Sequence, residues 1–232
     1  MKYRGILFDK DGTLLDFNRT WLPVYLYAAL EFAEGDTRLA DRLLREHGYA
    51  AEQNRFVGGS LLAAGNNRQI AEAWAGQTDR VGQVDALSRR LNKIFRDHGA
   101  RHATAVEGLA TTLDRLKCDG YRLGVATADS HQGIVDTLAS FDVLQQFDFL
   151  AGYDSGHGIK PEPGMVLAFC EHTALGVDDV VVVGDNRHDI EMGRNAGAGL
   201  CVGVLTGTST RNDLEDIADV VLDDIGALPG IV

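Results

Sequence analysis

Two hydrophobic patterns divide the 232 residues of the chain. Short apolar runs predict parallel-sheet strands at residues 4–9, 121–127, 147–150, 180–184, 200–204 and 220–222. Between these runs, apolar residues recur at helical spacing and predict helices at residues 109–117, 134–140, 165–172 and 190–196. Strands that alternate with helices are typical of an α/β fold with a parallel sheet covered by helices on both faces.

The segment from Asn18 to Arg96 has a different pattern. Its apolar residues, including Trp21 and Trp74, follow helical spacing with polar faces between them. Glycines interrupt the helical stretches, and no run in the segment predicts a strand. We therefore expect an α/β core domain from residues 1–16 and 100–232, and a helical domain at residues 17–99 inserted after the first strand.

Composition narrows the class of partner and the compartment. The net charge of −12 argues against nucleic acid or an anionic membrane as partner. No apolar stretch is long enough to span a membrane, and no signal-peptide pattern opens the chain. Cys118, Cys170 and Cys201 lie far apart without metal-site spacing, which favours reduced thiols and a cytoplasmic protein. The sequence does not choose between a monomer and a homodimer.

Two carboxylates mark the end of the first strand. Asp9 and Asp11 are two residues apart, and Gly12 permits a tight turn after them. Carboxylates this close repel each other unless a positive charge lies between them, and hard oxygen ligands suit Mg²⁺. A surface turn is the alternative interpretation, because Asp-Gly is a common turn pair.

Polar residues also follow the later strands. They are Thr127 and Ala128, Lys160 in a loop, and Asp185 and Asp189 after the valine run. Ligands of a doubly wound sheet bind beyond the carboxyl ends of its strands. We therefore expect these residues to meet Asp9 and Asp11 in one crevice.

These residues form four motifs, in order, that resemble those of the haloacid dehalogenase superfamily. The motifs are Asp-x-Asp-Gly-Thr-Leu at 9–14, Thr127, Lys160, and Gly-Asp-x-x-x-Asp at 184–189. The resemblance covers residues 1–16 and about 100–225 and implies a doubly wound, Rossmann-like fold. The segment 193–197 and the Lys-Pro-x-Pro loop are similar to the phosphoglycolate phosphatase-like branch, whose helical C1 cap the insert resembles.

The resemblance implies a role for each core residue. Asp9 would be the nucleophile that forms an aspartyl-phosphate, and Asp11 would be the general acid and base. Thr127 and backbone amides near Ala128 would bind the phosphoryl oxygens. Lys160 would neutralise charge on the nucleophile and the phosphate.

The resemblance also implies a magnesium site. Asp9, Asp185 and the backbone carbonyl of Asp11 would hold Mg²⁺, and Asp189 would bind the metal or a neighbouring ligand. Asp11 favours a phosphate ester as substrate, because dehalogenases of this superfamily lack an aspartate at that position. We expect Lys10 to point away from the site as a solvated or cap-facing side chain.

The insert contains a candidate loop for substrate selection. In segment 55–60, Arg55 and Ser60 offer polar groups and Gly59 permits close backbone approach. A plain helix–helix turn is the alternative interpretation. If the loop closes over the site, it would also exclude water while Asp9 is phosphorylated.

The sequence predicts a Mg²⁺-dependent phosphatase that hydrolyses a small phosphorylated metabolite, resembling phosphoglycolate phosphatases. A phosphomutase of the β-phosphoglucomutase type is one alternative, although residues 18–25 lack the histidine and lysine that such mutases use in the cap. A phosphorylatable signalling module is another, because receiver domains also place Asp, Thr and Lys on a parallel sheet. The large insert and Asp11 argue against this last interpretation.

Overall fold

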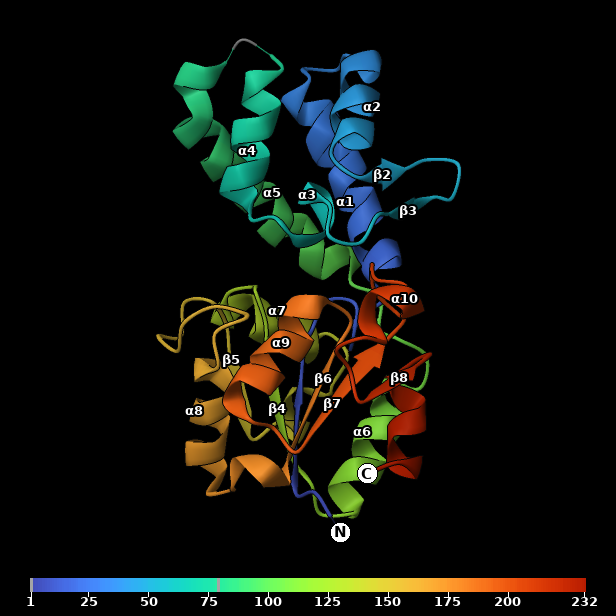
Figure 1. Ribbon diagram of the computed structural model, residues 1–232. Helices are drawn as coiled ribbons and strands as arrows, with labels where there is room; N and C mark the ends of the chain where they lie inside the picture. Colours follow the sequence, from blue (N-terminus) through green and yellow to red (C-terminus); the bar gives the residue numbers. More distant parts are fainter. Residues whose placement is uncertain (1, 79) are drawn as a thin grey trace. The chain divides into compact units, whose positions relative to one another are not determined.

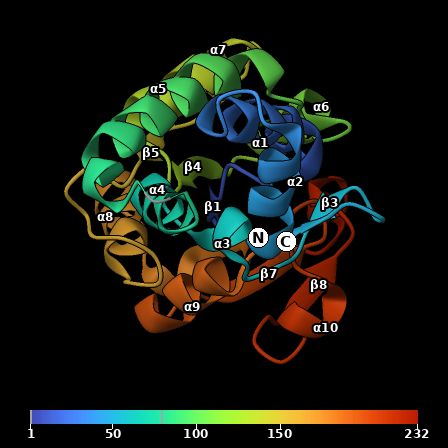
Figure 2. The ribbon, with the colours of Figure 1, turned by 90° about the horizontal axis from the view of Figure 1, so that it is seen from above.

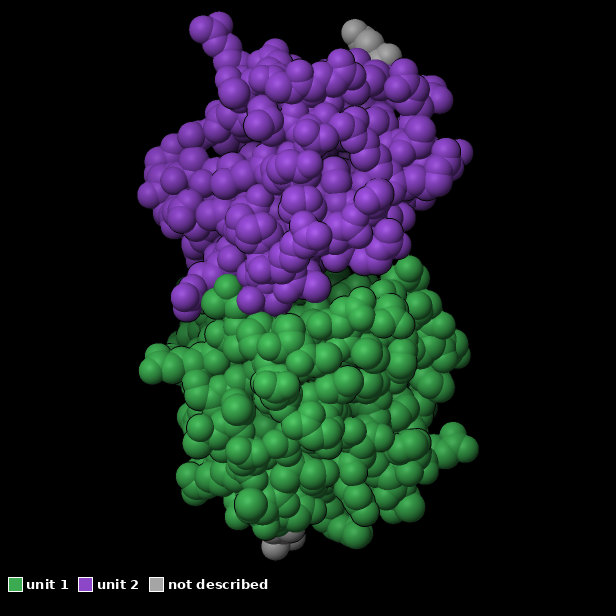
Figure 3. Space-filling model, turned by 180° about the vertical axis from the view of Figure 1, so that it is seen from behind, with its two compact units in different colours: residues 1–17, 104–232 green, residues 18–103 purple. Residues whose placement is uncertain are grey.

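The chain forms two compact units in a computed structural model that describes residues 2–78 and 80–232 (Figure 3). One unit comprises residues 1–17 and 104–232, and the other comprises residues 18–103. The core unit is the one that contains the first strand and the later strand–helix repeats. The helical unit is the segment inserted between its two parts.

The core unit contains a six-stranded parallel sheet (Figure 1). Its strands, in spatial order, are β5 (Phe149–Ala151), β4 (Arg122–Ala126), β1 (Gly5–Phe8), β6 (Val180–Gly184), β7 (Leu200–Val204) and β8 (Val220–Leu222). The central strand β1 pairs with both β4 and β6, and Phe8 lies beside Val125 and Val183. The predicted doubly wound sheet is therefore confirmed.

Helices cover both faces of this sheet. They are α6 (Leu109–Cys118), α7 (His131–Ala139), α8 (Gly164–Thr173) and α9 (Arg187–Ala196), with the short α10 (Arg211–Leu214) after β7. The view along the strands shows α6 and α7 on one side and α8 and α9 on the other (Figure 2). Among the described residues, the core unit also contains three short 3₁₀ helices: η2 (Leu144–Gln146), η3 (Val177–Asp179) and η4 (Ile225–Gly230).

Strand alternation divides the apolar side chains between these two layers. On β1, Ile6 and Phe8 pack with the α6 and α7 side, while Leu7 packs with the α8 and α9 side. All five residues of β6 are buried, as its valine run predicts. Gly124 lets α8 approach closely, because a Cβ there would lie 2.8 Å from the Phe169 ring.

The helical unit is built from five α-helices and a short hairpin within its described residues. The helices are α1 (Phe17–Phe32), α2 (Thr37–Glu46), α3 (Leu61–Ala64), α4 (Asn67–Gly76) and α5 (Val84–His102), with the 3₁₀ turn η1 (Val81–Gln83) before α5. Trp74 is fully buried and packs edge-on against Phe32 at 5.2 Å between ring centroids. Aromatic packing of this kind gives the unit its own apolar core.

The expectation of no strand in this segment was wrong. Strands β2 (Tyr49–Ala50) and β3 (Arg55–Phe56) pair as an antiparallel hairpin. Each strand has only two residues, which is too short for an alternating pattern to appear in the sequence. Within the described part of the chain, no helix combines the length and apolar character needed to cross a membrane.

Asp148 joins the starts of two neighbouring strands. Its carboxylate accepts hydrogen bonds from the Leu123 backbone, Lys117 and Arg122, each at 2.9 Å. Burial acts to raise the pKa of Asp148, but these three donors outweigh it and lower the pKa from 3.8. The ionised carboxylate therefore stabilises the edge of the sheet from which the strands begin.

The first prediction concerns this carboxylate. Asp148→Asn should lower the free energy of unfolding by about 1 kcal/mol at neutral pH, because charge-assisted hydrogen bonds are weakened. A lowered folded-state pKa gives stability that is present above the unfolded value and lost as pH falls through the folded value. Urea unfolding of both proteins from neutral to acidic pH should therefore show the difference shrinking below about pH 4. A difference that stays constant with pH would contradict this explanation.

Candidate active site

A tight turn after β1 places the first motif. The carbonyl oxygen of Lys10 accepts hydrogen bonds from the amides of Leu14 and Leu15, both at 3.0 Å. Gly12 adopts a φ of 95°, which other residues rarely adopt, and its carbonyl accepts a 2.6 Å hydrogen bond from the Thr206 hydroxyl. These bonds hold Asp9 and Asp11 at the carboxyl end of the central strand.

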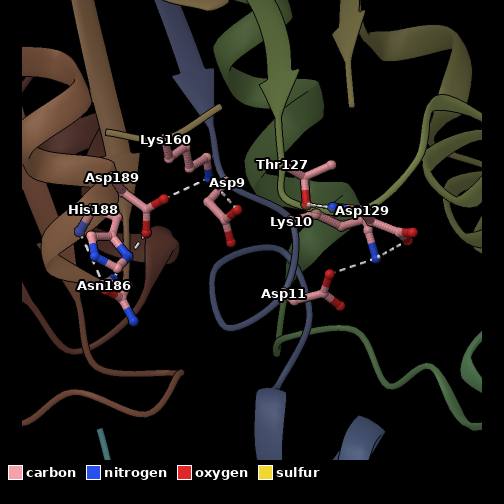
Figure 4. A network of polar contacts seen from close by, with 9 residues as sticks. All are labelled: Asp9, Lys10, Asp11, Thr127, Asp129, Lys160, Asn186, His188 and Asp189. Carbon is pink, nitrogen blue, oxygen red and sulfur yellow. Dashed lines mark hydrogen bonds and ion pairs between the residues drawn. The ribbon is translucent and has the colours of Figure 1, made fainter. Parts of the chain in front are cut away.

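Three carboxylates from two strand ends gather beside Lys160. Asp9, Asp185 and Asp189 are buried, and each offers an oxygen atom within 4.8 Å of the others. The Lys160 ammonium group lies 2.5 Å from an oxygen of Asp9 and 2.5 Å from an oxygen of Asp189 (Figure 4). The motifs that follow β1 and β6 and the loop that follows β5 therefore meet at one edge of the sheet.

Local backbone structure fixes Asp185 and Asp189. The Asp185 carboxylate accepts a 3.0 Å hydrogen bond from the Thr208 amide. Gly207 leaves room for it, because a Cβ there would lie 1.8 Å from its Oδ2 atom. Asp189 forms a capping box at the start of α9, where its carboxylate accepts a 2.9 Å hydrogen bond from the Asn186 amide.

The electrostatics of this cluster favour an added cation. Burial, together with the charges of Asp189 and Asp11, raises the pKa of Asp9 to about 7 against the opposing effect of Lys160. Burial, together with Asp189 and Asp9, also raises the pKa of Asp185 well above its usual value. Lys160 itself has a raised pKa, because the two aspartates outweigh the effect of burial. One lysine thus faces three carboxylates, and the charge is not balanced.

The donor set fits a hard divalent cation. Its ligands are carboxylate oxygens, which Mg²⁺ prefers over nitrogen or sulfur. Gly12 and Gly207 clear the space around Asp185, since a Cβ on Gly12 would also lie 2.5 Å from the Asp185 carboxyl carbon. Asp9, Asp185 and Asp189 are thus a cluster that could bind a metal.

Thr127 lies at the end of β4. Its side chain is buried, and its hydroxyl oxygen accepts a 3.2 Å hydrogen bond from the Asp129 amide. Ala128 follows it, and Ser130 caps α7 by accepting a 3.1 Å hydrogen bond from the Gly133 amide. The loop therefore carries backbone amides at a helix start, an arrangement that suits an anion.

The expectation that Lys10 is a solvated side chain was wrong. Its side chain is 1% exposed and forms ion pairs with Asp11 at 2.7 Å and with Asp129 at 3.1 Å. Burial acts to lower the pKa of Lys10, but these two carboxylates outweigh it and raise the pKa. The side chain does leave the strand on the side opposite to Asp9, but it enters a buried charged network instead of solvent. Sequence alone did not show that network, because Asp129 comes from a different strand end.

The predicted substrate loop lies in the helical unit. Arg55 is on β3, and its guanidinium donates a 2.9 Å hydrogen bond to the Gln53 side chain. Gly59 has a φ of 71° and lies in the turn before α3. Ser60 follows it and is the N-cap residue of α3. The Ser60 hydroxyl oxygen is buried without a hydrogen-bond partner. The role of these three residues stays a prediction.

The loop after β7 contributes residues that the sequence prediction missed. Thr206 binds the turn carbonyl of Gly12, and Gly207 and Thr208 shape and bind Asp185. The same rule that identified the other motifs, polar residues at a strand's carboxyl end, applies to this loop. The segment was overlooked because none of its residues has a charged side chain.

Comparison with known proteins identifies the family. The family model of haloacid dehalogenase-like hydrolases matches residues 6–202, and the chain belongs to this family. Pyrophosphatase PpaX of Bacillus velezensis is 28% identical over 194 residues, which cover 83% of this chain and 79% of that protein. The predictions of the superfamily and of a hydrolase of phosphatase type are therefore confirmed.

Solved structures show the same fold. A predicted phosphoglycolate phosphatase from Haemophilus somnus superposes with a TM-score of 0.78 at 21% identity, covering 100% of this chain and 98% of that one. A protein provisionally described as a beta-phosphoglucomutase from Thermotoga maritima gives 0.73 at 19% identity, covering 99% and 100%. At these identities the likeness shows the fold alone.

The second prediction concerns Lys160. In chelator, Lys160→Met should lower the free energy of unfolding by about 3 kcal/mol at neutral pH, because it leaves buried carboxylates unpaired. Because the folded-state pKa of Asp9 is raised to about 7, this group removes stability as pH rises from its unfolded pKa of about 4 towards about 7. Chemical denaturation should therefore show a smaller deficit at acidic pH, where Asp9 takes up a proton.

A matched control is Lys93→Met, which breaks an exposed ion pair with Asp97 in the helical unit. Exposed pairs contribute little to stability, so this variant should unfold like the unmodified protein. If Lys160→Met showed a deficit of the same size at every pH, lost packing and not unpaired charge would be its cause.

Proposed function

We propose that the chain is a Mg²⁺-dependent phosphatase that hydrolyses a phosphate monoester of a small metabolite through an aspartyl-phosphate on Asp9. The observation that carries this proposal is the contact of Lys160 with Asp9 beside Asp185 and Asp189, while Asp11 pairs with Lys10 instead. The two aspartates of the first motif thus have different surroundings. Different surroundings allow two carboxylates to take different roles.

In the first half-reaction, a carboxylate oxygen of Asp9 attacks phosphorus. The bond from phosphorus to the leaving oxygen breaks, and Asp11 gives that oxygen a proton. In the second half-reaction, Asp11 takes a proton from water as the water oxygen attacks phosphorus. The bond to Asp9 then breaks, which releases phosphate and restores both carboxyl groups.

Other residues of the core bind the group that is transferred. Lys160 reduces the repulsion between the Asp9 carboxylate and the phosphate. The Thr127 hydroxyl and the backbone amides at Ala128 would hold phosphoryl oxygens at the start of α7. Because these groups are fixed before substrate arrives, little reorganisation opposes the reaction.

Asp9, Asp185 and the backbone carbonyl of Asp11 would hold Mg²⁺. Asp189 would contribute to this site as a ligand or by holding Lys160, which it contacts at 2.5 Å. When bound, the ion would offset the negative charge shared by the carboxylates and the phosphate. Glycines at 12 and 207 support this assignment, because they leave room around Asp185.

The relatives support a small phosphorylated substrate. One is named as a pyrophosphatase and one structural neighbour as a predicted phosphoglycolate phosphatase. We propose that residues 17–99 form a C1-type cap and that Arg55, Gly59 and Ser60 select the leaving group. A hydroxyl, a guanidinium and flexible backbone are suited to a small acid.

Phosphoryl transfer within a sugar phosphate is the second candidate function. A structural neighbour from Thermotoga maritima with the same fold is provisionally described as a beta-phosphoglucomutase, which brings this candidate into consideration. Residues 18–25 of this chain include no histidine or lysine that would serve such a transfer. Chromatography of a sugar phosphate after incubation distinguishes the two, because a mutase yields an isomer and a phosphatase yields free phosphate.

We also propose that the enzyme works in the cytoplasm. The chain has free cysteines at 118, 170 and 201, and the latter two are buried. Burial raises the pKa of the Cys201 thiol to about 11, so this thiol stays protonated and unreactive. Unpaired thiols are typical of reducing compartments.

The third prediction tests the nucleophile and the metal. Phosphate release should be measured on phosphoglycolate, pyrophosphate and a sugar phosphate, with Mg²⁺ or with chelator. Asp9→Asn should lower kcat roughly a thousandfold or more, because it removes the group that forms the covalent intermediate. Chelator should stop the reaction, and added Mg²⁺ should restore it.

The matched control is Asp148→Asn, the same chemical change at the opposite edge of the sheet. It should keep full activity at temperatures where the protein is folded. Phosphate release that survives Asp9→Asn would show that another group attacks phosphorus, and release that is unaffected by chelator would remove the metal from the proposal.

The fourth prediction concerns Gly207. A Cβ at this position would lie 1.8 Å from Oδ2 of Asp185, so Gly207→Ala should displace that carboxylate. The Mg²⁺ concentration for half-maximal activity should rise on the order of tenfold, as for other changes beside a metal ligand. Gly156→Ala is the control, because a Cβ there would meet nothing within 4 Å, although its φ of 82° adds local strain. An unchanged Mg²⁺ requirement in Gly207→Ala would contradict the role of Asp185.

A further inference from the structure

Lys10 is buried between two carboxylates that come from different strand ends. Its side chain is 1% exposed, and lysines are almost never buried to this extent unless they are paired. Its ammonium group lies 2.7 Å from Oδ2 of Asp11 and 3.1 Å from Oδ2 of Asp129 (Figure 4). We call Lys10, Asp11 and Asp129 the Lys10 triad. None of the roles assigned above uses the lysine of this triad.

Asp129 is held firmly enough to anchor Lys10. Its other carboxylate oxygen accepts a 2.7 Å hydrogen bond from the Ser130 amide, and its own amide donates to the Thr127 hydroxyl at 3.2 Å. Gly133 of α7 leaves room for the carboxylate, because a Cβ there would lie 2.3 Å from Oδ2. The position of the Lys10 ammonium is therefore set from the loop after β4 as well as from β1.

The turn after β1 brings the Asp11 carboxylate beside the Lys10 side chain. Consecutive side chains of an extended strand point to opposite sides, which separates Lys10 from Asp9. The chain then turns, with the Lys10 carbonyl accepting from the amides of Leu14 and Leu15, and Asp11 reaches the Lys10 side. As a result Asp9 contacts Lys160 and Asp11 contacts Lys10.

An ammonium group can only donate hydrogen bonds. A protonated carboxyl group has one O–H donor and one oxygen that still accepts. Lys10 can therefore hold Oδ2 of Asp11 both before and after proton transfer, but only if the proton is on Oδ1. The ion pair thus selects which of the two oxygens carries the proton.

We propose that Lys10 is a positioning residue, anchored by Asp129, which fixes Oδ2 of Asp11 so that Oδ1 gives the proton to the leaving oxygen. This inference rests on the proposed function, in which Asp11 is the general acid. Loss of Lys10 leaves Asp11 in place as a chemical group but removes the ion pair that fixes its Oδ2 atom. The defect should therefore appear in protonation of the leaving group and not in attack by Asp9.

Two probe substrates separate these steps. The para-nitrophenolate group leaves readily without a proton, whereas phenolate is a poorer leaving group and gains more from general acid catalysis. The ratio kcat/KM reports steps up to departure of the leaving group, so slow hydrolysis of the aspartyl-phosphate does not affect it. The comparison of phenyl phosphate with para-nitrophenyl phosphate therefore measures leaving-group protonation.

The fifth prediction is made for Lys10→Met with these two probes. The kcat/KM for phenyl phosphate should fall on the order of tenfold more than that for para-nitrophenyl phosphate, because general acid catalysis contributes typically a hundredfold or more. Asp11→Asn should show the same selective loss. The double variant Lys10→Met/Asp11→Asn should lose no more than Asp11→Asn alone, since Lys10 acts through Asp11.

Two further variants disturb the anchor without changing Lys10. Asp129→Asn weakens the ion pair, and Gly133→Ala displaces the Asp129 carboxylate while it favours the helix α7. Both should reduce the phenyl phosphate rate selectively, by a factor of about 3, because an indirect contact is weakened and not removed. These variants decide the question if Lys10→Met fails to fold by circular dichroism.

The control is Lys117→Met, which removes a lysine paired to Asp148 at the opposite edge of the sheet. It should leave the ratio between the two substrates unchanged. If Asp11→Asn is selective but Lys10→Met and the anchor variants lower both substrates equally, Lys10 is only structural and the inference is wrong. If the unmodified protein releases phosphate from neither probe nor from any metabolite, the proposed function itself fails.

Discussion

Repulsion among buried carboxylates is the constraint on which the organisation of this site depends. One carboxylate oxygen from each of Asp9, Asp185 and Asp189 lies within 4.8 Å of the other two, in surroundings that raise the pKa of Asp9 to about 7. Bringing like charges together out of water is unfavourable, and Lys160 compensates for only part of it. The packing of the sheet offsets the remaining unfavourable free energy, because it holds the strand ends together. The remaining negative charge is the reason that the cluster could bind a cation.

The two aspartates of the first motif gain different surroundings from one local event, the turn at Gly12. Before the turn, Asp9 faces Lys160, and after it, Asp11 faces Lys10. Lys160 pairs with Asp9 and Asp189, whereas Lys10 pairs with Asp11 and Asp129. Asp9 and Asp11 are therefore close in sequence but belong to different ion-pair clusters, which supports different roles as nucleophile and acid.

Much of the fold and of the site was predictable, because both depend on local pattern. Each predicted run in the core contains or overlaps an observed strand, and Thr127, Lys160, Asp185 and Asp189 lie after strands as predicted, while their roles stay predictions. Parallel strands place their carboxyl ends on one edge, so order along the chain becomes proximity in space. The hairpin of β2 and β3 was missed, since two residues carry no periodicity. The burial of Lys10 was missed because its second partner, Asp129, is distant in sequence.

The sequence by itself determined the class of fold, the family and the residues of the four motifs, because hydrophobic period and motif spacing are local properties of the chain. Only the tertiary structure decided which lysine side chain pairs with which carboxylate. Lys10 and Lys160 are both buried against aspartates, but the sequence predicted a place in the site only for Lys160. Packing decides these pairings, because ion-pair partners come from strand ends that meet only when the sheet forms.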